Sequence, residues 1–101
     1  MKKIEFYTRL MKNGVAVAEK VTGYTDGSYN YYKQAYGTWC AVHPFSGLAI
    51  PTSYGETRKN AVAMAHAYTE VIARNITVVN HQALLFQEMI KEVEKNEKNI
   101  D

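Results

Sequence analysis

Apolar and polar residues alternate near the start of the chain, which is the pattern of a half-buried β-strand. One face of a strand over residues 4–10 would carry Ile4, Phe6, Thr8 and Leu10. Asn13 and Gly14 follow, and this pair is a strong signal for a two-residue hairpin turn because both residues tolerate positive φ. The returning strand is predicted over residues 15–22.

Three more strands are predicted before residue 53. Residues 28–36 are rich in tyrosine and polar side chains and predict a third strand, and residues 38–43 predict a fourth. Residues 44–47, Pro-Phe-Ser-Gly, have the composition of a turn. Residues 48–50 then predict a short fifth strand, which should end at Pro51 because proline has no amide donor for a sheet.

The hydrophobic spacing changes to three and four after residue 55, which predicts two amphipathic helices. The first is predicted over residues 56–74, with Thr57 as its N-cap. Its alanines would allow close packing on the sheet, on the second helix or on a copy of itself. Residues 75–80 are predicted as a linker, and the second helix over residues 80–98, with Asn80 as its cap.

These patterns predict one α+β domain over residues 1–101, in which an N-terminal antiparallel sheet of about five strands (1–53) is followed by two α-helices. The content of hydrophobic residues, 47%, and of charged residues, 22%, is typical of a globular domain. The net charge of +2 argues against a dedicated nucleic-acid-binding surface. A single cysteine favours a reducing compartment, and no apolar run approaches a membrane span, so we expect a cytoplasmic protein with no membrane partner.

Tyrosine is frequent in this chain, with eight residues, most of them between Tyr24 and Tyr54. Tyrosine is common on half-buried sheets and at interfaces, where the ring packs and the hydroxyl stays hydrated. Together with the alanine-rich first helix, the tyrosines predict a homo-oligomer built on a dimer, for example a hexamer.

The sequence shows no pattern of a catalytic or metal site. His43, His66 and His81 lack the mutual spacing of metal ligands. Cys40 and His43 lie three residues apart on a predicted strand and would point to opposite faces, so they do not form a nucleophile and its base. We therefore expect no enzymatic activity, no metal and no cofactor.

The start of the first predicted helix is the best candidate for binding chemistry. Free amides and the helix dipole favour an anion at such a terminus. Thr57 would cap the helix, Arg58 could add a bidentate contact to a phosphate, and Lys59 could add a point charge. The alternative is that these are ordinary solvated residues of a helix start.

Three further residues complete the predicted ligand site. Trp39 and Tyr54 are aromatic rings near the helix start on which a nucleotide base could stack, and His43 is included with them. The alternatives are that Trp39 belongs to the core and that His43 is an ordinary residue at a strand end. Together the six residues predict a small anionic nucleotide as the partner.

Four segments carry a resemblance to a known family: KKIEFYTRLMKNG, GYTDGSYNYYK, WCAVHPFSGLAI and GETRKNA. In their order and architecture they resemble the phage-encoded Thoeris anti-defence sponge proteins over nearly the whole chain. The resemblance implies a non-enzymatic viral oligomer in the host cytosol. It also implies sequestration of a cyclic ADP-ribose-type or cyclic nucleotide immune second messenger, which inhibits anti-phage defence.

A second resemblance rests on Pro44 and Gly47 of the turn, on Gly55-Glu56-Thr57, and on Ala61 and Ala65. These residues are similar to the hairpin and helix start of HicB-like antitoxins. The sheet before this hairpin is longer than that family needs, and no clear DNA-binding domain follows. The resemblance implies an inhibitor that binds another protein through an exposed strand edge.

Overall fold

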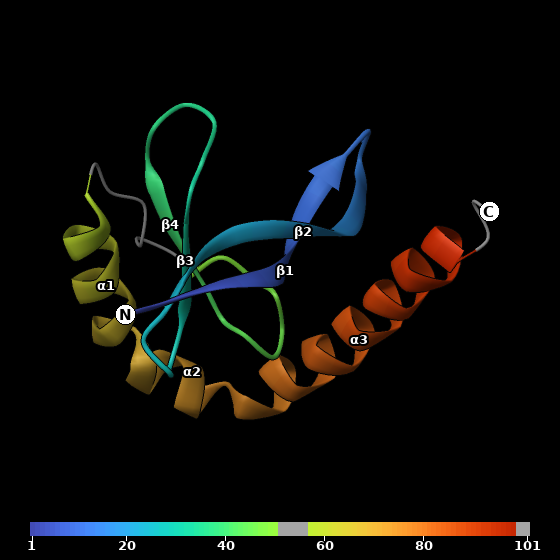
Figure 1. Cartoon of the computed structure of the whole chain (residues 1–101). Coiled ribbons are helices and arrows are strands. Elements are labelled where there is room, and N and C mark those ends of the chain that lie inside the picture. Colours follow the sequence, from blue (N-terminus) through green and yellow to red (C-terminus); the bar gives the residue numbers. More distant parts are fainter. Residues whose placement is uncertain (51–56, 99–101) are drawn as a thin grey trace.

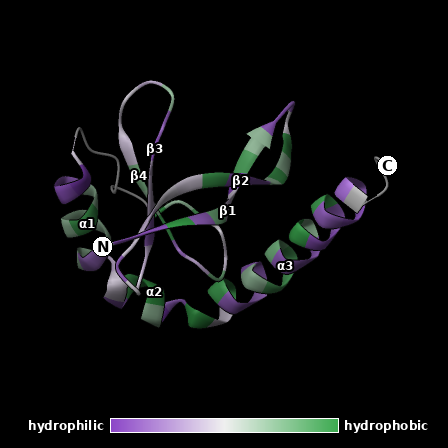
Figure 2. Cartoon of the chain, in the orientation of Figure 1, coloured by the Kyte–Doolittle hydropathy of each residue, from purple (hydrophilic) through white to green (hydrophobic). Residues whose placement is uncertain are grey.

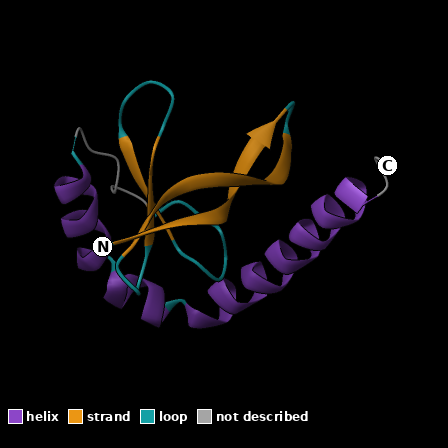
Figure 3. Cartoon of the chain, in the orientation of Figure 1, coloured by secondary structure: helices purple, strands orange, loops and turns teal. Residues whose placement is uncertain are grey.

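A four-stranded antiparallel sheet precedes the helices in the computed structural model, which describes residues 1–50 and 57–98 (Figures 1 and 3). The sheet order is β1-β2-β3-β4. Its strands are β1 (Lys2–Lys12), β2 (Val15–Thr25), β3 (Asn30–Lys33) and β4 (Trp39–Val42). The helices are α1 (Arg58–Ala67), α2 (Thr69–Arg74) and α3 (Ile76–Lys98). The predicted α+β class and the order of sheet before helices are confirmed.

The hairpin of β1 and β2 forms as the alternation predicts, and both strands are longer than expected. Lys12 pairs with Val15 across the turn. Asn13 (φ 52°) and Gly14 (φ 78°) take the positive φ values that a two-residue turn needs. Phe6 and Thr8 are buried on the predicted inner face.

Gly23 lies just before the part of β2 that pairs with β3, while β2 stays paired with β1 along its whole length. It faces Ile4 of β1, and only the next two residues, Tyr24 and Thr25, pair with β3. A Cβ atom at this position would overlap the backbone carbonyl oxygen of Tyr31. Glycine therefore permits the close approach of β3 to this strand.

The predicted fifth strand is reduced to a single bridge between Ala49 and Val42, so the prediction of about five strands becomes four. The amide of His43 donates to the carbonyl of Leu48, and the amide of Ile50 donates to the carbonyl of Ala41, both at 2.9 Å. Between the turn and the proline at position 51, only three residues remain to pair with β4, which is too short for a full strand.

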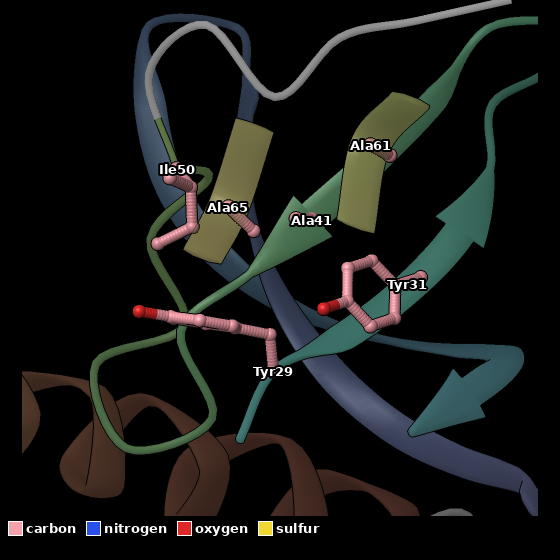
Figure 4. Packing of buried hydrophobic residues seen from close by; sticks show 6 residues of the cluster. All are labelled: Tyr29, Tyr31, Ala41, Ile50, Ala61 and Ala65. Atoms are coloured by element: carbon pink, nitrogen blue, oxygen red, sulfur yellow. The ribbon is translucent and has the colours of Figure 1, made fainter. Parts of the chain in front are cut away.

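The main core lies between α1 and the sheet. Ala61 and Ala65 of α1 are fully buried against Ala41 of β4 and the rings of Tyr29 and Tyr31 (Figure 4). The alanines of this helix were expected to allow packing on the sheet, on the second helix or on a copy of the chain. The described residues show α1 packed on the sheet. Because both tyrosines are buried within the chain, they do not form the exposed surface on which the oligomer prediction partly rested.

The first predicted helix is divided at Tyr68 into α1 and α2. Tyr68 has φ −92° and ψ −2°, and its amide bonds to the carbonyls of Ala65 and His66. Just after this break, the hydroxyl of Thr69 lies 2.7 Å from the hydroxyl of Tyr29, the residue before β3. The turn at Tyr68 thus lets the chain follow the curved sheet, and the helices form an arc around it (Figure 1).

The predicted linker over residues 75–80 is wrong, because α3 begins at Ile76 and Asn80 lies inside it. Asn75 alone separates α2 from α3: its side-chain amide donates to the carbonyl of Val71 at 2.8 Å, and its carbonyl accepts the amide of Val79 at 3.0 Å. The β-branched residues suggested a break, but helix propensity is a weak preference that tertiary packing overrides.

Phe86 fixes α3 to the sheet. Its side chain is 1% exposed, and the guanidinium of Arg9 on β1 lies 5.7 Å from its ring centroid. Arg9 also donates to the side-chain and main-chain oxygens of Gln82, at 2.7 and 2.9 Å. A Cβ atom at Gly47 would overlap the ring of Phe86, so glycine makes room for it there.

Candidate functional site

Arg58, the first residue of α1, lies over two aromatic rings of the sheet. The carbon at the centre of its guanidinium group is 4.4 Å from the ring centroid of Tyr24 and 5.8 Å from that of Trp39. The two rings are 6.2 Å apart and tilted by 45°. The sheet therefore positions this cation by cation–π contact with two rings. A solvated arginine has no such contacts to fix its position.

The helix start around Arg58 is free of negative charge within the described residues. Thr57 caps α1 as predicted, since its hydroxyl accepts the amide of Asn60 at 3.2 Å. No acidic side chain lies in the first turn. In the described part of the chain, neither Arg58 nor Lys59 forms an ion pair with a carboxylate.

A surface depression of about 530 Å³ adjoins this helix start. Its lining residues are Met1, Arg58, Lys59, Val62 and Ala63. The depression therefore combines two cations with a short apolar wall. This is suitable for a ligand that carries both an anionic group and an apolar or planar part.

The structure brings together four of the six predicted site residues. Thr57, Arg58 and Lys59 follow one another at the start of α1, and Trp39 supports Arg58. Tyr24 also supports Arg58 but was not predicted, because the two residues are far apart in the sequence and no local signal links them. Tyr54 lies outside the described residues.

His43 does not join this group. It follows the end of β4, whereas Trp39 begins that strand, so about 13 Å separates them along the strand at about 3.3 Å per residue. The Nδ1 atom of His43 lies 2.9 Å from the hydroxyl oxygen of Ser46 and 3.3 Å from its amide nitrogen. Because the amide can only donate, Nδ1 accepts, and the neutral ring carries its proton on Nε2.

The pair of His43 and Ser46 stabilises the turn before Leu48. Burial lowers the pKa of His43, which favours the neutral ring. Ser46 is 1% exposed, and its hydroxyl oxygen also accepts the amide of Leu48 at 3.4 Å. Ser46 is buried and its hydroxyl takes part in the contacts of the turn, so it lacks the accessibility that a catalytic nucleophile needs.

A polar network centred on Asp26 joins α1 to the turn between β2 and β3. One carboxylate oxygen accepts the hydroxyl of Tyr31 at 2.6 Å and lies 2.7 Å from Nε2 of His66, and the other accepts the amides of Ser28 and Tyr29 at 2.9 Å. Sequence reasoning did not connect His66 with Asp26, because no local signal links residues forty positions apart.

The network shifts two pKa values. Burial would raise the pKa of Asp26, but the hydrogen bonds from Tyr31, His66 and the two amides outweigh it and hold this pKa well below its usual range. Burial, with the nearby Asp26 carboxylate, raises the pKa of Tyr31 well above its usual range. Asp26 is therefore an ionised anchor for α1.

No protein-family model, curated protein or solved structure matches this chain. The resemblances to sponge proteins and to HicB-like antitoxins therefore stay predictions, and a functional proposal has to rest on the residues themselves. Across residues 1–50 and 57–98, no three metal-binding side chains gather in one place. Within the same ranges, no helix is both long and apolar enough to cross a membrane.

Proposed function

We propose that this chain binds a small anionic nucleotide at Arg58 and holds it without chemical change. The observation that carries the proposal is the guanidinium of Arg58, which lies over Tyr24 and Trp39 at the start of a helix whose first turn, Arg58 onward, holds no acidic residue. By its resemblance to sponge proteins, the ligand would be a cyclic nucleotide or a cyclic ADP-ribose-type second messenger. Sequestration in the host cytosol would then inhibit anti-phage defence.

The stacked geometry of Arg58 suits phosphate binding. The cation–π contacts use no N–H donor of Arg58, and these donors bond to no described residue, so they remain available to a ligand. Two parallel N–H donors match two phosphate oxygens, and the ring contacts reduce the conformational entropy that Arg58 would lose on binding. The free amides at the start of α1 and the charge of Lys59 would add to this attraction.

Binding without turnover fits the surroundings of this site. Within the described residues, the depression beside Arg58 is lined by Met1, Lys59, Val62 and Ala63, which supply neither a general base nor a nucleophile with a partner. Trp39 is already engaged with Arg58, so in this proposal its first role is to position the cation. Stacking of a base on Trp39 or Tyr54 stays a prediction.

We also propose that the sponge is a homo-oligomer. With the core tyrosines buried, the support for this comes from α3, where large apolar side chains remain exposed. Hydrophobic residues recur along the length of this helix (Figure 2). Val78 is 61% exposed, Leu84 is 69% exposed and Leu85 is 45% exposed. Such side chains are typical of surfaces that contact another chain.

The test is a binding comparison of Arg58→Ala and Arg58→Lys with wild type, by equilibrium dialysis against cyclic nucleotides and cyclic ADP-ribose isomers. A bidentate charged hydrogen bond contributes roughly 2–3 kcal/mol, so Arg58→Ala should weaken binding about 30–100-fold. Arg58→Lys should also bind more weakly, because lysine lacks the planar fork. Arg74→Ala, at an exposed arginine of α2 paired with Glu70, is the matched control.

Unchanged binding by Arg58→Ala would reject this site, and equal loss in Arg74→Ala would indicate non-specific electrostatic attraction.

The second candidate function is an inhibitor, similar to HicB-like antitoxins, that binds another protein. The exposed Leu84 and Leu85 of α3 favour this function, because they could contact another protein. The resemblance itself implies contact through an exposed strand edge instead. A wild-type protein that binds no nucleotide but co-purifies with one defined protein would support this alternative.

A further inference from the structure

A second cavity, of about 380 Å³, lies where the segment after β4 meets α2 and the start of α3. Its lining residues are His43, Ser46, Leu48, Ala49, Ile50, Tyr68, Val71, Ile72, Asn75 and Val79. We infer that this cavity is a binding site for a small uncharged aromatic molecule that carries both a hydrogen-bond acceptor and a hydrogen-bond donor.

The walls of the cavity determine the charge and polarity of its ligand. Most of the described lining side chains are aliphatic or aromatic, and none of them is an aspartate, glutamate, lysine or arginine. An ionised ligand would lose its hydration there without gaining an opposite charge. The volume lies within the range of small-molecule sites, which are mainly apolar with a few polar groups that fix orientation.

Two of the lining residues have unused hydrogen-bonding capacity. The contact from the amide of Ser46 fixes the tautomer of His43, so Nε2 carries a proton that it does not donate to any described residue. Asn75 donates through its side-chain amide to the carbonyl of Val71, and its Oδ1 atom accepts from no described group. Together with the hydroxyl of Tyr68, which bonds to no described residue, the described lining of the cavity offers available donors and acceptors.

This site is separate from the proposed nucleotide site. Arg58 begins α1 and Tyr68 follows its end, so about 15 Å of helix separates them at about 1.5 Å per residue. The depression beside Arg58 and the cavity beside Tyr68 share no lining residue. Failure of one proposal therefore leaves the other unaffected.

Benzamide is a suitable probe, because it is uncharged and planar and has a carbonyl acceptor and amide donors. We would titrate it into the isotopically labelled full-length protein and follow methyl resonances by NMR. Saturable shifts at Ile50, Ile72 and Val79 at millimolar benzamide are expected. The absence of shifts at these methyl groups, or shifts spread evenly over the surface, would overturn the inference.

Two neighbouring valines supply a matched pair of variants. Val79 lines the cavity, whereas the adjacent Val78 is 61% exposed and is not among the described lining residues. Val79→Phe should fill the cavity and weaken benzamide binding at least tenfold, and Val78→Phe should change it less than twofold. Equal effects of the two variants would overturn the inference. If Val79→Phe does not fold, the methyl shifts of the wild type still decide the question.

Two analogues test the chemical class. Benzoate has the same shape but a negative charge, and toluene keeps the ring but has no hydrogen-bonding group. Benzamide should bind most tightly, toluene more weakly, and benzoate at least tenfold more weakly than benzamide. Benzoate binding as tightly as benzamide would contradict an uncharged ligand, and equal binding of toluene would contradict the role of His43 and Asn75.

Discussion

Replacement of Phe86 by alanine is the strongest test of how α3 is held against the sheet. Phe86 is 1% exposed, and its ring lies against Gly47 and under the guanidinium of Arg9, 5.7 Å from the centroid. Replacement by alanine would remove the ring and leave an empty space beside Gly47 and Arg9. It would also leave Arg9, whose Nε atom is buried without a described partner, with less support.

The expected cost follows from the size of the buried ring. Phenylalanine-to-alanine changes at buried sites destabilise proteins by about 3–5 kcal/mol, and loss of a partly exposed cation–π contact adds about 0.5–1 kcal/mol. A domain of this size is stable by roughly 5–15 kcal/mol. Phe86→Ala should therefore remove a large part of the total stability, while α1 and the hairpin of β1 and β2 keep their local contacts.

The assay is urea unfolding followed by circular dichroism, with Leu85→Ala as the matched control. Leu85 is the neighbouring residue of α3 and is 45% exposed, so its truncation should cost less than about 1 kcal/mol. The positions are adjacent, and Phe86→Ala removes about twice as much apolar side chain as Leu85→Ala, whereas the expected costs differ by more than twofold. Their difference therefore reports which face of α3 packs on the sheet.

A cost of Leu85→Ala equal to or larger than that of Phe86→Ala would refute this packing. If that cost also depended on protein concentration, α3 would be stabilised mainly by another copy of the chain through its outer face. Unfolding curves at two concentrations tenfold apart distinguish these cases, because only an oligomer has a stability that depends on concentration.

Three further changes have defined outcomes. Asp26 has a pKa lowered by folding, so its stabilisation is present above the unfolded pKa of about 3.9 and is lost as the pH falls through the lower folded value. Asp26→Asn should cost about 2 kcal/mol at pH 7, and the difference from wild type in urea unfolding should shrink below about pH 4. A constant difference would contradict the ionised anchor. Gly23→Ala should cost about 3 kcal/mol or more in the same assay, because its Cβ would overlap the carbonyl of Tyr31, and a near-neutral effect would contradict the close approach of β3. Thr57→Ala should cost about 1 kcal/mol of thermal stability by loss of the cap, and an unchanged melting temperature would mean that the cap contributes little.

Local signals predicted the parts of the fold that local physics determines. Asn13 and Gly14 specify a turn by their own tolerance of positive φ, and Thr57 specifies a helix start by its own hydroxyl. The approach of Trp39 to Arg58 was also predicted, because the segments that carry them are close in sequence. These features need little knowledge of distant residues.

Features that depend on distant contacts were missed. Val78 and Val79 suggested a break by their β-branched side chains, yet α3 includes them, and Val79 lines a cavity with residues from the segment after β4. Asp26 and His66 meet only because α1 packs across β3. His43 was grouped with Arg58 by closeness in sequence, but it follows the end of β4, whereas Trp39, which contacts Arg58, begins that strand.

Native mass spectrometry of the full chain, mixed with cyclic oligonucleotides and cyclic ADP-ribose isomers, tests the proposed function most directly. The account predicts a discrete oligomer that gains one of these ligands at stoichiometric occupancy. Heating should release that ligand with its mass unchanged, and Arg58→Ala should not retain it. A chain that gains none of these ligands, or that releases a product of different mass, would contradict a sponge that holds its nucleotide at Arg58.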